Sequence, residues 1–226
     1  CELKSHVSIV GNTKIGQDNI FYPFCSIGSD PQDLKFNNEK SYLIIGNKNK
    51  FRENVTVNPG TIGGGLNTTI KNNCLFMVGS HIAHDCKIES NVILANNATL
   101  AGHVEIGENA IVGGNSGIHQ FVQIGKFAMI GGMSGVEKNI LPYCLYMGIR
   151  TNLKGLNLIG LKRNNVSRER IKIILKFLKK IFNKETTLDL QLKNIEKEYE
   201  NFIEIKEIIQ FIYNSNKRGI ASFGDE

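Results

Sequence analysis

The chain has 226 residues, 41% of them hydrophobic, and its net charge is +6. This composition is sufficient for a buried core, and no apolar run approaches the ~18 residues that cross a bilayer, which excludes an integral membrane segment. The five cysteines are an odd number, and three of them occupy small positions of the repeat described next, so we expect reduced thiols in a soluble, cytoplasmic protein.

One apolar position recurs every six residues through the middle of the chain. The series runs through Ile70, Phe76, Ile82, Ile88, Leu94, Leu100, Ile106, Val112, Ile118, Ile124, Ile130 and Val136. Neither a helix, with a period of about 3.6, nor an alternating strand, with a period of about 2, keeps one apolar residue at this interval. A mostly small residue follows four positions later, as at Cys74, Ser80 and Cys86. The pattern predicts short strands stacked into a β-solenoid with tight corners.

The same register occurs nearer the N-terminus. It passes through Leu3, Ile9, Ile15, Phe21, Ile27, Ile45, Phe51 and Val57. Residues 29–43 and 61–69 interrupt it and predict two loops that leave the solenoid, and loops on such scaffolds often carry function. Because Leu3 is already in register and Cys1 is not an initiator Met, we expect that further N-terminal coils precede this chain.

The period changes after the last proline, Pro142. Apolar residues at helical spacing follow in two groups: Ile171, Ile174, Leu175, Leu178 and Phe182, then Ile195, Tyr199, Phe202, Ile205, Ile208, Ile209 and Ile212. Ser167 is the expected N-cap of the first helix. The sequence thus predicts a mainly β protein, with a parallel β-helix over residues 1–150 and a connector and small helical domain over 151–226.

The first of these helices is strongly basic. Its region contains Lys162, Arg163, Arg168, Arg170, Lys172, Lys176, Lys179, Lys180 and Lys184, with Glu169 as the one acidic residue among them. The row is either the solvated face of an ordinary amphipathic helix or a docking site for an acidic partner. No aromatic interleaving or nucleic-acid motif supports a role in binding nucleic acid.

Three histidines are expected to gather on one side of the solenoid. In a triangular coil of three hexads, positions eighteen apart lie above one another at about 4.8 Å. Ile82, Leu100 and Ile118 form such a set, and their hexads carry His84, His103 and His119. His81 lies at the corner just before.

Asp85 directly follows His84. Adjacent side chains of a strand point to opposite faces. A His84–Asp85 pair therefore requires that the backbone at the corner turn one of the two side chains toward the other. If the pair forms, the carboxylate orients the imidazole, which removes a proton from a hydroxyl, an effect worth about 10²- to 10⁴-fold. The other interpretation is that Asp85 is simply a turn residue.

These residues resemble one enzyme family. The motifs are His81-Ile-Ala-His84-Asp85-Cys86, Ile93-Leu-Ala-Asn-Asn-Ala-Thr-Leu-Ala-Gly-His103, Gly113-Gly114, Ile118-His119-Gln120-Phe121, Gln32-Asp-Leu-Lys35, Gly160-Leu-Lys-Arg163 and Ser167-Arg-Glu. They closely resemble the UDP-N-acetylglucosamine O-acyltransferases, cytosolic enzymes that begin lipid A synthesis. The resemblance spans nearly the whole chain and implies a left-handed β-helix of hexapeptide repeats.

The resemblance also implies the reaction and the roles of individual residues. An (R)-3-hydroxyacyl group passes from acyl carrier protein to the glucosamine 3-hydroxyl, with His84 as general base, Asp85 orienting it and the Gly102 N–H as oxyanion donor. The expected substrate-binding residues are Gln32, Asp33, Lys35, His81, His103, His119, Gln120, Asn157 and Arg163. The two cationic residues among them suit phosphate. No cofactor or metal is implied.

Further expectations concern partners and specificity. By the resemblance, acidic acyl carrier protein docks on Arg168, Lys172, Lys176 and Lys179, and Gly132 limits acyl length, with a long groove expected because it has no side chain. The family forms homotrimers with the site between subunits, and usually has about two more N-terminal coils. Four positions depart from the family's usual pattern: Asn58, Arg150, Ile159 and Asn164.

Three alternatives stand beside this interpretation. The related N-acyltransferase of lipid A synthesis typically has a separate N-terminal domain and lacks the Gln32–Lys35 motif. A γ-type carbonic anhydrase binds zinc through three converging imidazoles at ~2.0–2.1 Å. Here His84, His103 and His119 sit at different offsets within their hexads, which argues against convergence. A purely structural solenoid would give the stacked histidines no purpose.

Overall fold

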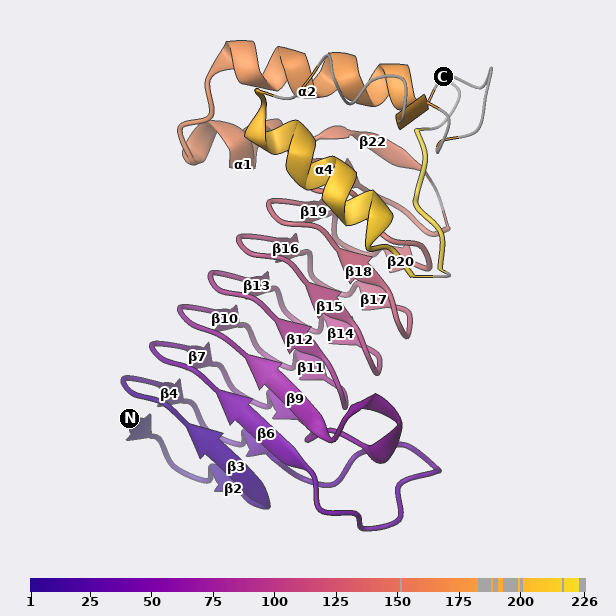
Figure 1. Cartoon of the computed structure of the whole chain (residues 1–226). Helices are drawn as coiled ribbons and strands as arrows, with labels where there is room; N and C mark the ends of the chain where they lie inside the picture. The colour runs from indigo at the N-terminus through magenta and orange to yellow at the C-terminus, as the bar shows by residue number, and fades with distance from the viewer. Residues whose placement is uncertain are drawn as a thin grey trace.

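The computed structural model describes residues 1–150, 152–182, 188, 191–192, 199, 201–216 and 218–223. Within these, the chain forms a left-handed parallel β-helix that carries a helical region at its C-terminal end (Figure 1). The six-residue period predicted the stacked strands, the helical spacing of apolar residues predicted the helical region, and the family resemblance implied the left hand. No helix among the described residues has the length and apolar content needed to span a membrane. Ile195 and Lys184, which belong to the predicted helical and basic patterns, lie outside the described residues.

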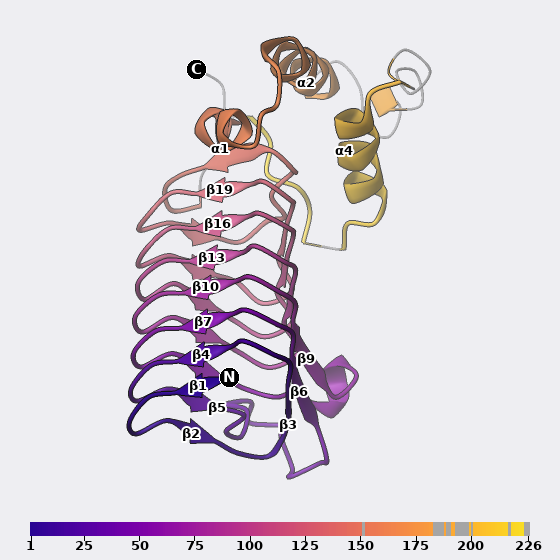
Figure 2. The same cartoon turned by 90° about the vertical axis from the view of Figure 1, so that its left-hand side faces the viewer.

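Three sheets form the sides of the prism. The first contains β1 (Glu2–Leu3), β4 (Ile20–Phe21), β7 (Lys50–Phe51), β10 (Leu75–Phe76), β13 (Ile93–Leu94), β16 (Ile111–Val112), β19 (Met129–Ile130), β21 (Cys144–Tyr146) and β22 (Leu153–Leu156). The second contains β2 (Ser8–Ile9), β5 (Ser26–Ile27), β8 (Thr56–Val57), β11 (His81–Ile82), β14 (Thr99–Leu100), β17 (Gly117–Ile118) and β20 (Gly135–Val136). The third contains β3 (Asn12–Ile15), β6 (Tyr42–Ile45), β9 (Asn67–Ile70), β12 (Lys87–Ile88), β15 (Glu105–Ile106) and β18 (Gln123–Ile124). Figure 2 shows the resulting ladder of coils.

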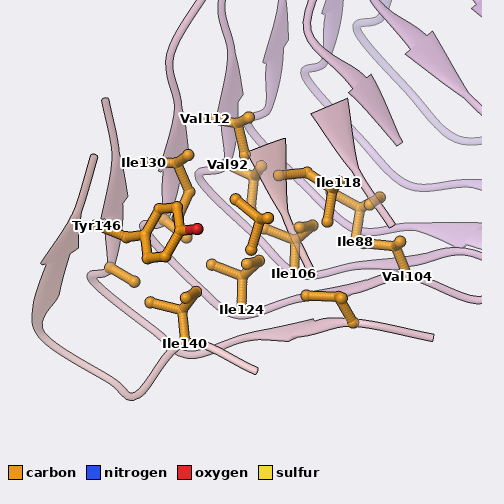
Figure 3. Close-up of a cluster of buried hydrophobic side chains, with 14 of the residues drawn as sticks. Ile88, Val92, Val104, Ile106, Val112, Ile118, Ile124, Ile130, Ile140 and Tyr146 are labelled. Carbon is orange, nitrogen blue, oxygen red and sulfur yellow. The ribbon is translucent and has the colours of Figure 1, made fainter. Parts of the chain in front are cut away.

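The predicted stacking register is confirmed. Ile82 pairs with Leu100 and Leu100 with Ile118 in parallel strands. From β4 onward, the second residue of each two-residue strand is buried, so the hexad series fills the interior of the β-helix, whereas Leu3 of β1 and Ile9 of β2 are not fully covered. Figure 3 shows part of this core, in which the side chains of Ile106 and Ile124 gather in the interior. Phe51 lies between Phe21 and Phe76, with ring centroids 4.7 and 4.8 Å away.

Buried cysteines occupy the small corner positions. Cys25, Cys74, Cys86 and Cys144 are buried and free. Burial raises the pKa of the Cys74 thiol to about 11 and that of Cys86 to about 12. These thiols therefore stay protonated and act as small apolar side chains.

Two loops leave the solenoid on the side of the third sheet, where Figure 1 shows them next to each other. The strands that follow them start at Tyr42 and Asn67, so the last residues assigned to each loop by sequence belong to four-residue strands. The reason is that β6 and β9 extend their pairing along β3 and along each other. The second loop contains a short 3₁₀ helix, η1 (Ile62–Gly64).

The C-terminal region contains α1 (Leu158–Arg163), α2 (Arg168–Ile181) and α4 (Ile203–Tyr213). Ser167 caps α2, since its Oγ accepts a hydrogen bond from the Arg170 N–H at 3.3 Å. Buried residues of α2 and α4 pack together. The chain then returns to the β-helix through parallel bridges from Ile220 to Asn139 and from Phe223 to Leu153.

An ion pair network fastens α4 to the upper coils. Glu207 accepts hydrogen bonds from Lys126 and from the Tyr143 hydroxyl. Burial, followed by the nearby Glu207 carboxylate, raises the pKa of Tyr143. On the neighbouring face, Arg170 of α2 pairs with the buried Glu204 of α4 at 3.0 Å. The helical region is thus attached to the β-helix by charged as well as apolar contacts.

Candidate active site

His84 and Asp85 form a buried pair at the corner between β11 and β12. The His84 Nδ1 lies 2.8 Å from the Asp85 Oδ2, and the two side chains are 7% and 2% exposed. Asp85 has a φ of 59°, in the left-handed region. This conformation turns its side chain back toward His84, which the alternation of an extended strand does not allow. An ionised Asp85 accepts from Nδ1–H, which leaves Nε2 with the lone pair of a base.

The Nε2 edge of His84 lies against the backbone of Gly102. A Cβ at Gly102 would lie 2.5 Å from Nε2 and 2.4 Å from Cε1. Only glycine allows the ring to approach so closely. The Gly102 N–H donates no hydrogen bond within the described part of the chain. A basic nitrogen and a free backbone donor therefore lie side by side.

The left-handed corner recurs in the next two coils. His103 and Phe121 have φ values of 61° and 65°, and their rings stack 4.3 Å apart. The His103 ring meets the His84 ring edge-on at 5.0 Å, and its Nε2 is 3.9 Å from the Asp85 Oδ2. Corner side chains that are eighteen residues apart thus form a continuous column beside the pair. Phe121 was named from the sequence only as part of a family motif and received no role, although its eighteen-residue spacing from His103 predicts this stacking.

Burial lowers the pKa of both neighbouring histidines. For His81 the nearby His84 adds to the effect of burial, and for His103 the Asp85 carboxylate opposes it. Both rings are therefore neutral near pH 7 and can act as hydrogen-bond partners. The His81 Nδ1 lies 2.7 Å from the Thr56 Oγ1. Thr56 is a further contact that the sequence analysis missed.

The other predicted residues divide into those near the pair and those apart from it. The Asp33 carboxylate interacts electrostatically with His103 and raises its pKa slightly against the effect of burial. The first loop therefore comes close to the stacked rings of His103 and Phe121. In that loop Asp33 Oδ1 accepts from the Lys35 N–H at 3.0 Å, and Gln32 is exposed. His119 and Gln120 are exposed two coils above His81.

Asn157 and Arg163 belong to the start and end of α1, several coils above β11 in Figure 1. The Asn157 side chain is engaged within the chain: Oδ1 accepts from the Gly160 N–H, and Nδ2 donates to the Phe127 carbonyl. Gly132 is exposed at a different corner, and a Cβ there would lie 3.3 Å from the Gly114 carbonyl oxygen. The single chain does not bring these three positions to His84.

The exposed row of α2 consists of Arg168, Lys172, Lys176 and Lys179. It lies on the opposite side of the helix from the buried Ile171, Ile174 and Leu178. The predicted amphipathic pattern is therefore present, and the basic face is open to solvent.

The four positions that depart from the family pattern have contacts of their own. Asn58 Nδ2 donates hydrogen bonds to the carbonyls of Ser29 and Asp30. These bonds hold the start of the first loop in place. Arg150 pairs with Glu137 at 2.7 Å. Ile159 is exposed, and Asn164 donates from Nδ2 to the Gly160 carbonyl.

A groove of about 350 Å³ lies on the outer face of the second sheet. Its floor includes Ala101, Gly117 and Gly135, and His119 and Ile149 lie at its sides. The groove exists because the outward-facing positions of β17 and β20 are glycines. Small floor residues of this kind leave room for an elongated apolar group.

One grouping among the described residues has donor atoms arranged closely enough for a metal ion. The donor atoms of His84, Asp85 and His103 all lie within 4.8 Å of one another. His119 is not part of it, as its different offset predicted, but His84 and His103 converge although their offsets also differ, because the left-handed corner at His103 brings its ring to His84. Asp85 Oδ2 already contacts His84 Nδ1 and accepts from the Thr61 hydroxyl, so the grouping is organised as a hydrogen-bonded pair.

Comparisons with known proteins give a consistent result. Residues 139–221 match the family described as "Udp N-acetylglucosamine O-acyltransferase; Domain 2", and residues 67–102 match the bacterial transferase hexapeptide repeat. The acyl-[acyl-carrier-protein]–UDP-N-acetylglucosamine O-acyltransferase of Rickettsia bellii is 51% identical over 98% of this chain and 79% of its own length. That of Rickettsia canadensis is 50% identical over 98% and 84%. The crystal structure of the Francisella novicida UDP-N-acetylglucosamine acyltransferase superposes with a TM-score of 0.93 at 34% identity, covering 98% of this chain and 81% of the other.

Proposed function

The chain belongs to the family of acyl-[acyl-carrier-protein]–UDP-N-acetylglucosamine O-acyltransferases, and on that premise we propose how its residues carry out the reaction. It transfers an (R)-3-hydroxyacyl chain from acyl carrier protein to the glucosamine 3-hydroxyl of UDP-N-acetylglucosamine, the first step of lipid A synthesis. Relatives that share half of the sequence over nearly the whole chain are O-acyltransferases, which favours this activity over the N-acyltransferase and carbonic anhydrase alternatives.

The observation that carries the catalytic assignment is the His84–Asp85 pair beside Gly102. The His84 Nε2 removes the proton from the sugar 3-hydroxyl as its oxygen attacks the thioester carbonyl. The oxyanion of the tetrahedral intermediate accepts a hydrogen bond from the Gly102 N–H. As the C–S bond breaks, His84 returns the proton to the leaving thiolate, and Asp85 stabilises the imidazolium between the two steps.

We assign nucleotide-sugar binding to the residues around this pair and at the upper end of the β-helix. His81 and His103 lie beside His84 and are neutral hydrogen-bond partners, which suits contacts to sugar hydroxyls. Gln32, Asp33 and Lys35 approach from the first loop, with Lys35 as a cation for phosphate. His119, Gln120, Asn157 and Arg163 complete the proposed set.

We assign the acyl chain to the groove on the second sheet, because its glycine floor provides an apolar channel with His119 at its side. As the family resemblance implies, we also assign the limit on acyl length to Gly132, at the corner that precedes β20. Acyl carrier protein, which is acidic, docks on the exposed row of Arg168, Lys172, Lys176 and Lys179.

We also propose a cytoplasmic homotrimer. The support is an apolar stripe along the outer face of the first sheet, formed by the half-buried outward-facing residues Leu75, Ile93, Ile111, Met129 and Leu145; the exposed Lys50 of β7 separates it from Ile20. An apolar sheet face of this length is typical of an interface between copies. Native mass spectrometry tests it, with three copies expected and a monomer contradicting the assignment.

The test of the reaction is an assay of purified protein with 3-hydroxyacyl carrier proteins of graded length, and with acceptors that carry a 3-hydroxyl or a 3-amino group. His84→Ala should abolish transfer while circular dichroism and assembly stay unchanged. His6→Ala is the matched control, because His6 lies far upstream and stacks on Phe24. Substantial turnover by His84→Ala would remove His84 from the role of base.

A further inference from the structure

The carboxylate of Asp85 is held by the second loop as well as by His84. The backbone N–H of Thr61 donates to Asp85 Oδ1 at 2.9 Å, and the Thr61 hydroxyl donates to Asp85 Oδ2 at 2.6 Å. The Asp85 N–H in turn donates to the Thr68 hydroxyl at 2.8 Å. Thr61 and Asp85 are both almost fully buried. Thr61 thus holds the Asp85 carboxylate, and Thr68 of β9, just after the loop, holds the Asp85 backbone.

The backbone of the second loop packs closely against the Asp85 carboxylate. A Cβ at Gly64 would lie 2.0 Å from the Asp85 Cγ, so the loop backbone passes directly against it. The Gly64 and Leu66 N–H groups both donate back to the Thr61 carbonyl, which closes the turn. The Ile62 N–H donates to Glu39 Oε1, which joins this loop to the first one. These contacts hold the Asp85 carboxylate in the orientation that faces His84.

The Thr61 hydroxyl shares Asp85 Oδ2 with His84 Nδ1. A donor to the same oxygen stabilises the carboxylate charge and weakens its attraction for the imidazolium. The imidazole is thereby kept oriented without holding its proton too strongly. Among the described residues, the other titratable groups that interact with this pair are His81, His103 and the Cys86 thiol, and the Asp33 carboxylate interacts with His103.

We propose that Thr61 is a positioning residue of the reaction, which orients Asp85 and moderates its hold on His84. This rests on the proposed function, in which His84 is the base. Thr61 touches neither substrate in this proposal, since its two donors are both directed at Asp85.

The experiment compares Thr61→Val and Thr61→Ser with the wild-type protein, with Thr69→Val as a control from the outward face of β9. Thr61→Val removes the hydroxyl and keeps the backbone donor. We expect kcat to fall about 10- to 100-fold while KM for UDP-N-acetylglucosamine stays within about twofold. The acidic limb of the kcat/KM profile should move to higher pH, because the imidazolium then faces a less stabilised carboxylate. Thr61→Ser should restore both.

Two outcomes overturn the proposal: wild-type kcat and pH profile in Thr61→Val, or equal impairment of Thr61→Ser, which would mean that shape and not the hydroxyl matters. If circular dichroism shows that Thr61→Val does not fold, Thr61→Ala takes its place under the same criteria. His84→Ala separates this test from the proposed function. An active His84→Ala contradicts the base assignment, whereas an inert His84→Ala with a fully active Thr61→Val contradicts only the role of Thr61.

Discussion

Replacing Gly102 by alanine tests the geometry of the base directly. Gly102 does not have a left-handed φ, so its backbone accepts alanine, and the N–H proposed as oxyanion donor is retained. The added Cβ would lie 2.4 Å from His84 Cε1, whereas ordinary contacts start at 3.4 Å. The ring must therefore withdraw by about 1 Å, and a misplacement of that size lowers a rate by about 100-fold.

The assay follows release of the carrier protein thiol at saturating substrates, so that kcat is measured apart from binding. We expect kcat of Gly102→Ala to fall about 100-fold, with KM for both substrates changed much less. Gly63→Ala is the matched control, because the nearest atom to its Cβ is the Thr61 Oγ1 at 3.8 Å. A folded Gly102→Ala protein with wild-type kcat would refute the claim that the close approach of His84 to Gly102 is needed for catalysis.

Three further predictions concern docking, pH and the core. Reversing Lys172, Lys176 and Lys179 to Glu should raise KM for acyl carrier protein at least about tenfold, because the exposed row loses its attraction for an acidic partner. KM for the nucleotide sugar should change little. Equal effects on both substrates would instead indicate a folding defect. Burial lowers the pKa of His81 below 6.5, so the unfolded chain binds the proton more readily and the folded protein loses stability as pH falls from 6.5 through the folded pKa. Thermal melts should show this decline and a weaker one in His81→Gln, and equal slopes would contradict the assignment. Phe51→Ala removes a fully buried ring between those of Phe21 and Phe76. It should lower the free energy of unfolding, measured with denaturant, by about 3–5 kcal/mol. A loss below about 1 kcal/mol would mean that this stack of three phenylalanine rings does not contribute to the stabilising core.

Much of the architecture follows from the sequence because stacking makes it periodic. The hexad series identifies the interior residues, and the eighteen-residue spacing puts Leu100 over Ile82, as the pairing shows. The pattern of α2 is equally local, since Ser167 and the buried face of the helix depend on neighbours within four residues. The starts of β6 and β9 are different, because they depend on pairing with β3, far away in the chain.

The sequence by itself determined the prism, its register and the side on which His84 and His103 meet, because a fixed repeat converts position in the chain into position in space. Only the tertiary structure decided that Asp85 turns back to His84, since this depends on the left-handed φ of the corner, 59° at Asp85, which recurs every six residues from Asn73 to Met133 but is not visible in the pattern of apolar residues. It also decided that Thr61, twenty-four positions earlier, donates twice to the Asp85 carboxylate. Loops do not follow the repeat, so the partners of their hydrogen bonds are set by the path of the folded chain and by the buried charge that it must satisfy.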